Sequence, residues 1–309
     1  TPNDALAGAC HYDCRLFAEY FWRGAWRGAE AIREKAESEG GSRMINDSAN
    51  LLEIRNLTTS FYLPDTGDTI DAVNDVSLCV KSGTITALIG ESGSGKSVTC
   101  KSIFHLIDPP GEIRHGEILF QGKDLLKMNQ QQRIRLYGNQ IFMIFQDCAD
   151  SLNPVYTVRH QMLELLRIHG KYHKKAEAEL QCLQALRQAH LADAERVFRS
   201  YPFELSGGMC QRVMIAMAFL VKPALLIADE PTTSLDLTIQ AGILEELKQM
   251  NAQGVSVLLI THDIGIVAQM ADDLYVMEAG HIVERGSVQN VFDAPKHPYT
   301  KQLLKAAGA

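Results

Sequence analysis

The sequence lacks several features that define common classes of protein. It has no charged-then-apolar leader and no apolar run long enough to cross a membrane, since a spanning helix needs about 20 apolar residues. We therefore expect a cytosolic chain that neither spans a membrane nor is exported by itself. Positive charge is also scarce, because 30 lysines and arginines face 37 aspartates and glutamates, a net charge of -7. This balance disfavours nucleic-acid binding, which usually needs a basic face.

The cysteines do not form a recognisable framework. Seven of them, an odd number, are spread over 309 residues, and no CxxC pair indicates a zinc site. Reduced thiols fit this pattern better than disulfides do. The remaining composition, 46% hydrophobic and 22% charged, is typical of a soluble globular protein with one large core, or one core carrying a smaller subdomain.

The most informative motif is Gly90–Ser97, which matches the phosphate-binding pattern G-x-x-x-x-G-K-[ST] without a mismatch. Small residues let backbone N–H groups face the phosphates, Lys96 adds positive charge, and the Ser97 hydroxyl can ligate Mg2+. A strand over 84–89 and a helix over 98–106 would supply the expected context, with the positive helix end facing the anion. A plain glycine-rich turn is the less favoured interpretation. The predicted nucleotide-binding residues here are Gly90, Ser92, Gly93, Ser94, Gly95, Lys96, Ser97 and Val98.

A second apolar segment, residues 224–228, ends in two carboxylates, Asp229 and Glu230. A run that is apolar throughout is typical of a parallel strand covered on both faces. In the simplest interpretation the two carboxylates are solvated loop charges. Beside a phosphate loop another interpretation is favoured, in which Asp229 holds Mg2+ through its water and Glu230 orients and deprotonates the attacking water.

Two further apolar segments end in polar residues in the same way. Residues 141–145 lead to Gln146, which can ligate Mg2+ or bind a water, and residues 255–260 lead to His262. Alone, neither is remarkable, because a lone histidine is more often a satisfied surface or core residue. Ligands of open α/β sheets, however, bind at the carboxyl ends of strands. The convergence of four such ends makes Gln146 and His262 candidate catalytic residues, together with Lys96 and Glu230.

A second candidate anion site lies within residues 204–212. Ser206 is a good helix N-cap, and Gly207 and Gly208 expose backbone N–H groups where an apolar helical run begins. A simple capped helix is the alternative interpretation. Because one ATP needs only one phosphate loop, a second helix terminus suggests an ATP held between two subunits.

Together these residues resemble the ATP-binding cassette (ABC) ATPases over about residues 50–309. One departure from the family pattern is Met209, which replaces the signature glutamine but leaves the serine and both glycines, so hydrolysis should survive it. In family order the chain has the Walker A loop 90–97, the Q-loop Gln146, a signature-like Leu-Ser-Gly-Gly-Met 205–209, Walker B 225–230, a D-loop-like Ser-Leu-Asp ending at Asp236, and the switch histidine His262.

Within this family the sequence is most similar to the dipeptide, oligopeptide and nickel importer ATPases. The likeness rests on the methionine-ending signature, on Ser-Leu-Asn-Pro at 151–154 and on the tail Pro295–Thr300. It implies a subunit that hydrolyses ATP at a dimer interface to drive peptide uptake, with nickel or metal-chelate uptake as the alternative. His297 in the tail is interpreted as structural. No iron–sulfur cluster is expected, because no cysteine follows Cys210.

The resemblance implies an α/β fold with three parts: a P-loop NTPase (RecA-like) core, an antiparallel β subdomain and an inserted α-helical subdomain. Residues 50–80 and 112–122 would form the β subdomain and residues 148–205 the helical one. The ABC ATPase domain would span 44–309 and end in the subfamily tail, about 288–309.

Two details of these subdomains are predicted. In the β subdomain, Phe61 or Tyr62 would stack on adenine, as an aromatic residue in this region does in relatives. In the helical subdomain, periodic apolar residues predict two buried faces. These are Val158, Met162, Leu165 and Leu166 on one face, and Leu180, Leu183 and Leu186 on the other.

Residues 1–43 match no part of the family and are treated as an extension of unknown role. The sequence begins at Thr1, and Met44 would be a natural start just before the first strand. A helix-spaced aromatic face between Leu16 and Trp26, flanked by arginines, predicts a partly helical segment. It could lie on a membrane or a permease. A helix packed on the domain, or a remnant of a fusion, is an equally good interpretation.

The resemblance also implies cofactors, partners and a location. We expect ATP and Mg2+, a second ABC ATPase subunit that is identical or related, two membrane permease subunits docked beside Gln146, and an extracytoplasmic substrate-binding protein acting indirectly. The chain would lie peripherally at the cytoplasmic face of the cell membrane. Two alternatives are less favoured: a soluble ABC ATPase acting on ribosomes or DNA, and a weakly active regulatory subunit, which intact Lys96, Glu230 and His262 disfavour.

Overall fold

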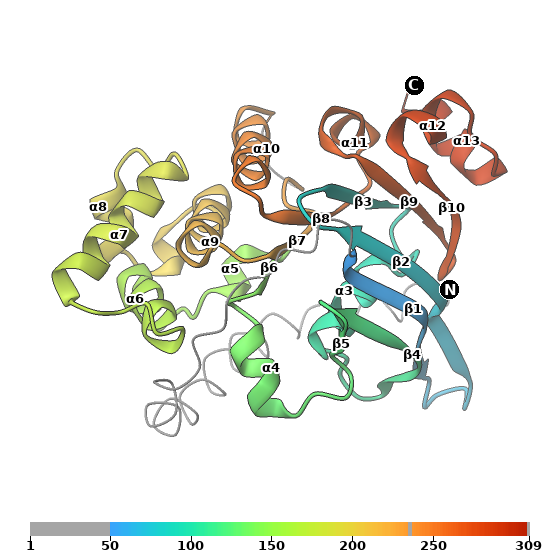
Figure 1. Cartoon of the computed structure of the whole chain (residues 1–309), viewed down its shortest axis with the longest axis horizontal. Helices are drawn as coiled ribbons and strands as arrows, with labels where there is room; N and C mark the ends of the chain where they lie inside the picture. The colour runs from blue at the N-terminus through green and yellow to red at the C-terminus, as the bar shows by residue number, and fades with distance from the viewer. Residues whose placement is uncertain (1–49, 234–236, 308–309) are drawn as a thin grey trace.

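Two sheets organise the part of the chain that the computed structural model describes, residues 50–233 and 237–307 (Figure 1). One sheet has four strands in the order β2-β1-β4-β5, and the other has six in the order β10-β9-β3-β8-β7-β6. The predicted N-terminal extension, residues 1–43, and the predicted D-loop residue Asp236 lie outside these described ranges.

The elements follow in chain order. The strands are β1 Asn50–Tyr62, β2 Thr69–Lys81, β3 Ile85–Ile89, β4 Gly111–Phe120, β5 Lys123–Asp124, β6 Ile141–Ile144, β7 Leu225–Asp229, β8 Ser256–Thr261, β9 Asp273–Glu278 and β10 His281–Ser287. The helices are α3 Lys96–Phe104, α4 Gln130–Leu136, α5 Cys148–Ser151, α6 Val158–Ile168, α7 Lys175–Gln188, α8 Ala194–Arg199, the 3-10 turn η1 Pro202–Glu204, α9 Gly207–Val221, α10 Leu237–Ala252, α11 Ile264–Met270, α12 Val288–Asp293 and α13 Pro298–Ala306.

The larger sheet is a parallel sheet with one antiparallel strand, β10, at its edge. Strands β3, β7 and β8 are buried along their whole length, as their continuous apolar runs predict. Alternate residues point to opposite faces: Leu226 joins a core with helices α9 and α10, and Ile227 joins one with α3 and the smaller sheet. Since the strands are parallel, their carboxyl ends lie at one edge of the sheet.

The smaller sheet is antiparallel, as predicted. Strand β1 pairs with both β2 and β4, and all three lie largely within the predicted ranges 50–80 and 112–122. Its alternating apolar residues Leu52 and Ile54 are buried against the core that also contains Ile103 of α3. This packing fixes α3 between the two sheets.

Helices α6, α7 and α8 gather at the end of the molecule away from the antiparallel sheet (Figure 1). The predicted face of α6 is buried, from Val158 to Leu166. On α7 the predicted buried face was wrong at Leu180, which is 52% exposed, whereas Leu186 is fully buried. A spacing of three residues drifts around a helix of 3.6 residues per turn. The buried stripe of α7 instead uses Ala178, Cys182, Ala185 and Leu186.

Helices α12 and α13 cover part of the larger sheet at β3 and β9, where Leu304 of α13 joins a core with Ile89 and Val276. The described cysteines, numbers 79, 100, 148, 182 and 210, are all free thiols. Among the described helices, none has the length and apolar character that crossing a membrane requires.

The buried stripe of α7 predicts different costs for two identical substitutions on one helix. Leu186→Ala leaves a cavity in a hydrophobic core and should lower the free energy of unfolding by about 2–5 kcal/mol. Leu180→Ala removes an exposed side chain and should change it by less than about 0.5 kcal/mol. Urea unfolding followed by circular dichroism measures both. Equal effects would contradict the packing described for this helix.

Candidate functional site

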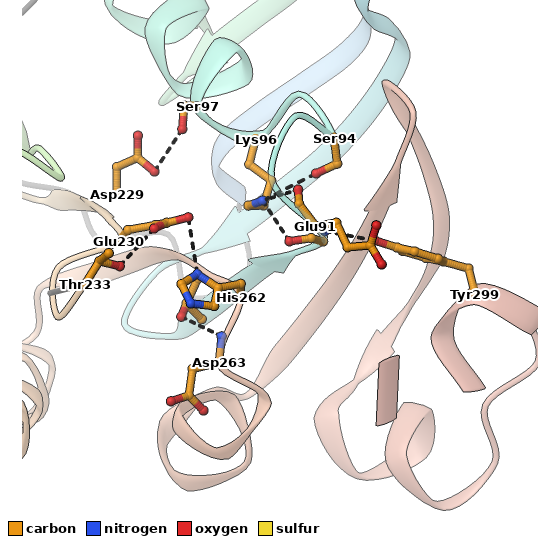
Figure 2. Close-up of polar contacts among 12 residues, drawn as sticks. Glu91, Ser94, Lys96, Ser97, Asp229, Glu230, Thr233, His262, Asp263 and Tyr299 are labelled. Carbon is orange, nitrogen blue, oxygen red and sulfur yellow. Dashed lines mark hydrogen bonds and ion pairs between the residues drawn. The ribbon is translucent and has the colours of Figure 1, made fainter. Parts of the chain in front are cut away.

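The loop between β3 and α3 holds a buried cation (Figure 2). Lys96 is the first residue of α3 and is only 4% exposed. Its Nζ donates hydrogen bonds to the carbonyl oxygens of Gly90 and Glu91, both at 2.8 Å. Burial lowers the pKa of Lys96, and the carboxylates of Glu230 and Asp229 oppose this shift. The loop thus curls around its own lysine.

Two glycines of this loop lie against other backbone segments. A Cβ at Gly90 would overlap the carbonyl oxygen of Met277, and one at Gly95 would overlap the carbonyl oxygen of Ala72. Gly95 also has φ +105°, a conformation that favours glycine. Gly93 has a positive φ as well, but a Cβ there would meet open space. The glycines therefore let the loop approach β2 and β9 closely.

The rest of the loop divides into an exposed tip and a buried base. Ser92 and Gly93 are exposed, while Ser94 is buried, with its Oγ 3.4 Å from Lys96 Nζ. Helix α3 begins at Lys96, before the predicted start at Val98, and ends at Phe104. Val98 is half-buried and packs on the core beside the antiparallel sheet.

Asp229 lies at the carboxyl end of β7 and is 4% exposed. The Ser97 hydroxyl donates to its Oδ1 at 3.3 Å (Figure 2). Burial raises the pKa of Asp229 to about 6, against the lowering effect of the Ser97 hydrogen bond. A hydroxyl beside a buried carboxylate is an all-oxygen donor set, and this is the set that suits Mg2+. The two residues therefore fit that ion.

Glu230 follows with φ +46°, which is unusual for a residue with a side chain. Its backbone N–H donates to the carbonyl oxygen of Ile260 in β8 at 2.9 Å. Its carboxylate accepts a 2.9 Å hydrogen bond from Thr233 Oγ1 and lies 3.4 Å from Nδ1 of His262 (Figure 2). The neighbouring strand end and two side chains thus fix the carboxylate.

The structure brings most of the predicted strand-end residues together, but not all. His262 follows β8. Its side chain is 57% exposed and pairs with Glu230. Gln146 follows β6, which pairs in register with β7, and its side chain is exposed, with no described hydrogen bond to Ser97 or Asp229. Its place at the end of β6 puts it at the same edge of the sheet as Asp229, and its role toward Mg2+ stays a prediction.

Ser206 is the N-cap of α9, as predicted, and its Oγ accepts a 3.3 Å hydrogen bond from Met209 N–H. Ser206 and Gly207 are exposed, and a Cβ at Gly207 would meet open space. Gly208 is buried beneath them. Among the described hydrogen bonds, none joins these residues to the loop at 90–97. The second candidate anion site is therefore presented outward.

The two adenine candidates differ in exposure. The Phe61 ring packs so close to Gly111 that a Cβ there would overlap it. Tyr62, the last residue of β1, is 47% exposed. Asp236 cannot be placed, because it lies outside the described residues.

Two residues that contact this site were not among the predicted site residues. Thr233, three residues after Glu230, donates a hydrogen bond to its carboxylate. This short spacing is a local signal from which the contact could have been predicted. The hydroxyl of Tyr299 accepts a 2.8 Å hydrogen bond from the backbone N–H of Glu91. No local signal connects those two residues, because 208 positions separate them.

The loop geometry predicts that Gly95→Ala is more damaging than Gly93→Ala. Both replace a glycine of positive φ, but only the Cβ at residue 95 overlaps another backbone segment. Gly95→Ala should therefore lower the free energy of unfolding by about 1–3 kcal/mol more than Gly93→Ala. Chemical denaturation of the two variants measures the difference. Equal destabilisation would show that the close approach to Ala72 is unimportant.

The chain is similar in sequence to known ATP-binding proteins of transporters. The model of the ABC transporter family matches residues 73–233. The chain is 46% identical over 258 residues to the "Probable peptide ABC transporter ATP-binding protein y4tR" of Sinorhizobium fredii, covering 83% of this chain and 76% of that protein. It is also 46% identical over 256 residues to the "Oligopeptide transport ATP-binding protein OppD" of Bacillus subtilis, covering 82% and 71%. Other matched relatives are longer, and the chain covers 47% and 42% of two of them.

A solved structure agrees with this result. The dimeric, post-hydrolysis state of the ATP-binding cassette MJ0796, bound to ADP and Pi, has a TM-score of 0.67 and 27% sequence identity. The match covers 77% of this chain and 98% of that one. The predicted fold class, an α/β P-loop NTPase of the ABC type, is confirmed. The chain therefore belongs to the ABC transporter family, as one of its ATP-binding proteins, which are ATPases that power transport.

Proposed function

We propose that this chain is the ATP-hydrolysing subunit of a peptide importer. One observation supports ATP hydrolysis most directly. The carboxylate of Glu230 is held by Thr233 and His262 at the end of β7, and its charge acts on the buried Lys96. The names of the two relatives, which specify peptide and oligopeptide transport, support peptides over nickel or metal chelates as cargo.

The phosphate loop is the proposed seat of ATP. Backbone N–H groups of Gly93, Gly95 and their neighbours would face the phosphates. Lys96 would keep its hydrogen bond to the Gly90 carbonyl and exchange its other loop partners for phosphate oxygens. Ser97 and Asp229 would hold Mg2+, with Gln146 joining them once the site closes. When bound, the ion would supply charge neutralisation on the transferred phosphate. The exposed Tyr62, rather than the packed Phe61, is the better placed ring for stacking on adenine.

Glu230 is the proposed general base. A carboxylate that accepts a hydrogen bond from Thr233 and approaches His262 is oriented before any water arrives, and such positioning is what proton abstraction requires. His262 would support the γ-phosphate from its exposed side. Lys96 would stabilise negative charge that develops during transfer.

The outward-facing end of α9 is the proposed second half of an ATP site. Ser206, Gly207 and Gly208 of one subunit would bind the phosphates held by Lys96 of another. Asp236, outside the described residues, is proposed as a further nucleotide-binding residue from its D-loop-like motif alone. The dimeric state of the structurally similar cassette supports this arrangement. The partner would be a second copy of this chain or a related subunit.

Coupling to transport is proposed through Gln146. Its exposed position between the parallel sheet and the helices α5 to α8 suits a residue that senses closure and contacts a permease. The full assembly would contain two permease subunits and, indirectly, an extracytoplasmic binding protein, with this chain at the cytoplasmic face of the membrane. We propose the domain division given above, 1–43 and 44–309, with the helical insertion at about 148–205 and the tail at about 288–309.

Glu230→Gln should trap the ATP-bound dimer. The amide keeps the size of the side chain and removes the base, so we expect little turnover but a dimer stable in ATP, detected by size-exclusion chromatography with a phosphate-release assay. Glu245→Gln, at an exposed position on α10, is the matched control and should behave as the unaltered protein does. Normal turnover in Glu230→Gln would remove Glu230 from the role of base.

The importer assignment predicts what the trapped protein binds. Tagged Glu230→Gln protein purified from detergent-solubilised membranes with ATP should carry permease subunits and a binding protein, identified by mass spectrometry. If that binding protein binds peptides, peptide cargo is supported. If it binds nickel instead, nickel replaces peptides as the proposed cargo. Ribosomal or DNA-repair proteins without a permease would contradict the transport role.

A further inference from the structure

The C-terminal tail lies against the base of the phosphate loop. Helices α12 and α13, near the C-terminus in Figure 1, pack on β3 and β9. Tyr299 and Leu304 of α13 share a core with Ile89, the last residue of β3 before the loop. The tail therefore contacts the strand that delivers Gly90.

The start of α13 is held in place by its own polar contacts. The carboxylate of Glu284 in β10 accepts hydrogen bonds from the backbone N–H groups of Lys296 at 2.8 Å and His297 at 2.9 Å. The Nδ1 of His297 then accepts a 3.3 Å hydrogen bond from Tyr299 N–H and caps the helix. These three contacts fix the start of α13, the helix that carries Tyr299.

Tyr299 reaches one particular peptide group of the loop (Figure 2). Its hydroxyl oxygen accepts a 2.8 Å hydrogen bond from Glu91 N–H. The carbonyl of that same peptide belongs to Gly90 and accepts a 2.8 Å hydrogen bond from Lys96 Nζ. Because a peptide group is planar, a hydrogen bond at each end fixes its orientation. Tyr299 holds one end and the catalytic lysine holds the other.

The Tyr299 hydroxyl keeps one protonation state near neutral pH. Tyr299 is 8% exposed, and burial raises its pKa above the ordinary value. It therefore remains a neutral hydroxyl near neutral pH, with a lone pair for the Glu91 N–H. Burial also means that its hydrogen bond competes little with water.

We propose that Tyr299 is a positioning residue for ATP binding, acting through the Gly90–Glu91 peptide. By holding this peptide from behind, the tail keeps the Gly90 carbonyl aimed at Lys96 and the loop in the shape that receives phosphate. The inference rests on the proposed function of the loop as the seat of ATP. It gives the tail motif Pro295–Thr300 a role in that site.

Tyr299→Phe in the full chain removes only the hydroxyl. We expect the Kd for ATP to rise about fivefold, in line with the usual net strength of one such hydrogen bond, and KM to rise similarly with little change in kcat. Amide hydrogen exchange at Glu91 should also become faster in the nucleotide-free protein.

Tyr275→Phe is the matched control. The Tyr275 hydroxyl likewise accepts a backbone N–H, but that of Cys79 in β2, at 3.1 Å, and not one of the phosphate loop. Tyr275→Phe should lose about as much thermal stability as Tyr299→Phe does, but it should bind ATP as tightly as the unaltered protein. The inference would be overturned if Tyr299→Phe bound ATP as tightly as the unaltered protein, or if Tyr275→Phe lost as much ATP affinity as Tyr299→Phe. Failure of the unaltered chain to bind ATP would instead overturn the proposed function, and this inference with it.

Discussion

A buried ammonium group is the constraint on which the site depends. Lys96 is nearly inaccessible, and a charge removed from water must be compensated by nearby polar groups. The carbonyls of Gly90 and Glu91 provide this, and they are within reach only because the loop curls tightly between β2 and β9. That curl requires glycine at Gly95, where a side chain would overlap Ala72. The sheet, the loop and the lysine therefore form one structural unit.

The same parallel sheet explains why much of the site could be predicted. Continuous apolar runs predicted buried strands, and the polar residues after them, such as Asp229 and His262, had to meet at one edge. Leu180 was mispredicted because a three-residue spacing was treated as a helical face. Tyr299 could not be predicted at all, since its contact with Glu91 depends on how α13 packs, and tertiary packing of distant segments leaves no local sequence pattern.

The described residues include two proposed phosphate-binding segments that share no described hydrogen bond. The loop at 90–97 faces the strand ends, whereas Ser206 and Gly207 at the start of α9 are exposed and share no described hydrogen bond with it. Gln211, one turn into α9, donates a hydrogen bond to the carbonyl of Pro231, directly after Glu230. The start of α9 is thus tied to the loop that carries the proposed base. A second subunit bound at α9 has a direct physical route to that residue.

Mixed dimers test most directly whether ATP is shared between subunits. Lys96→Ala and Ser206→Arg proteins, each inactive alone, are unfolded together, refolded as a mixture and assayed for phosphate release. In a mixed dimer one site keeps an intact Lys96 from one subunit and an intact Ser206 from the other, so the account predicts that hydrolysis returns on mixing. No recovery, while unaltered protein treated identically stays active, would contradict a site built from two chains.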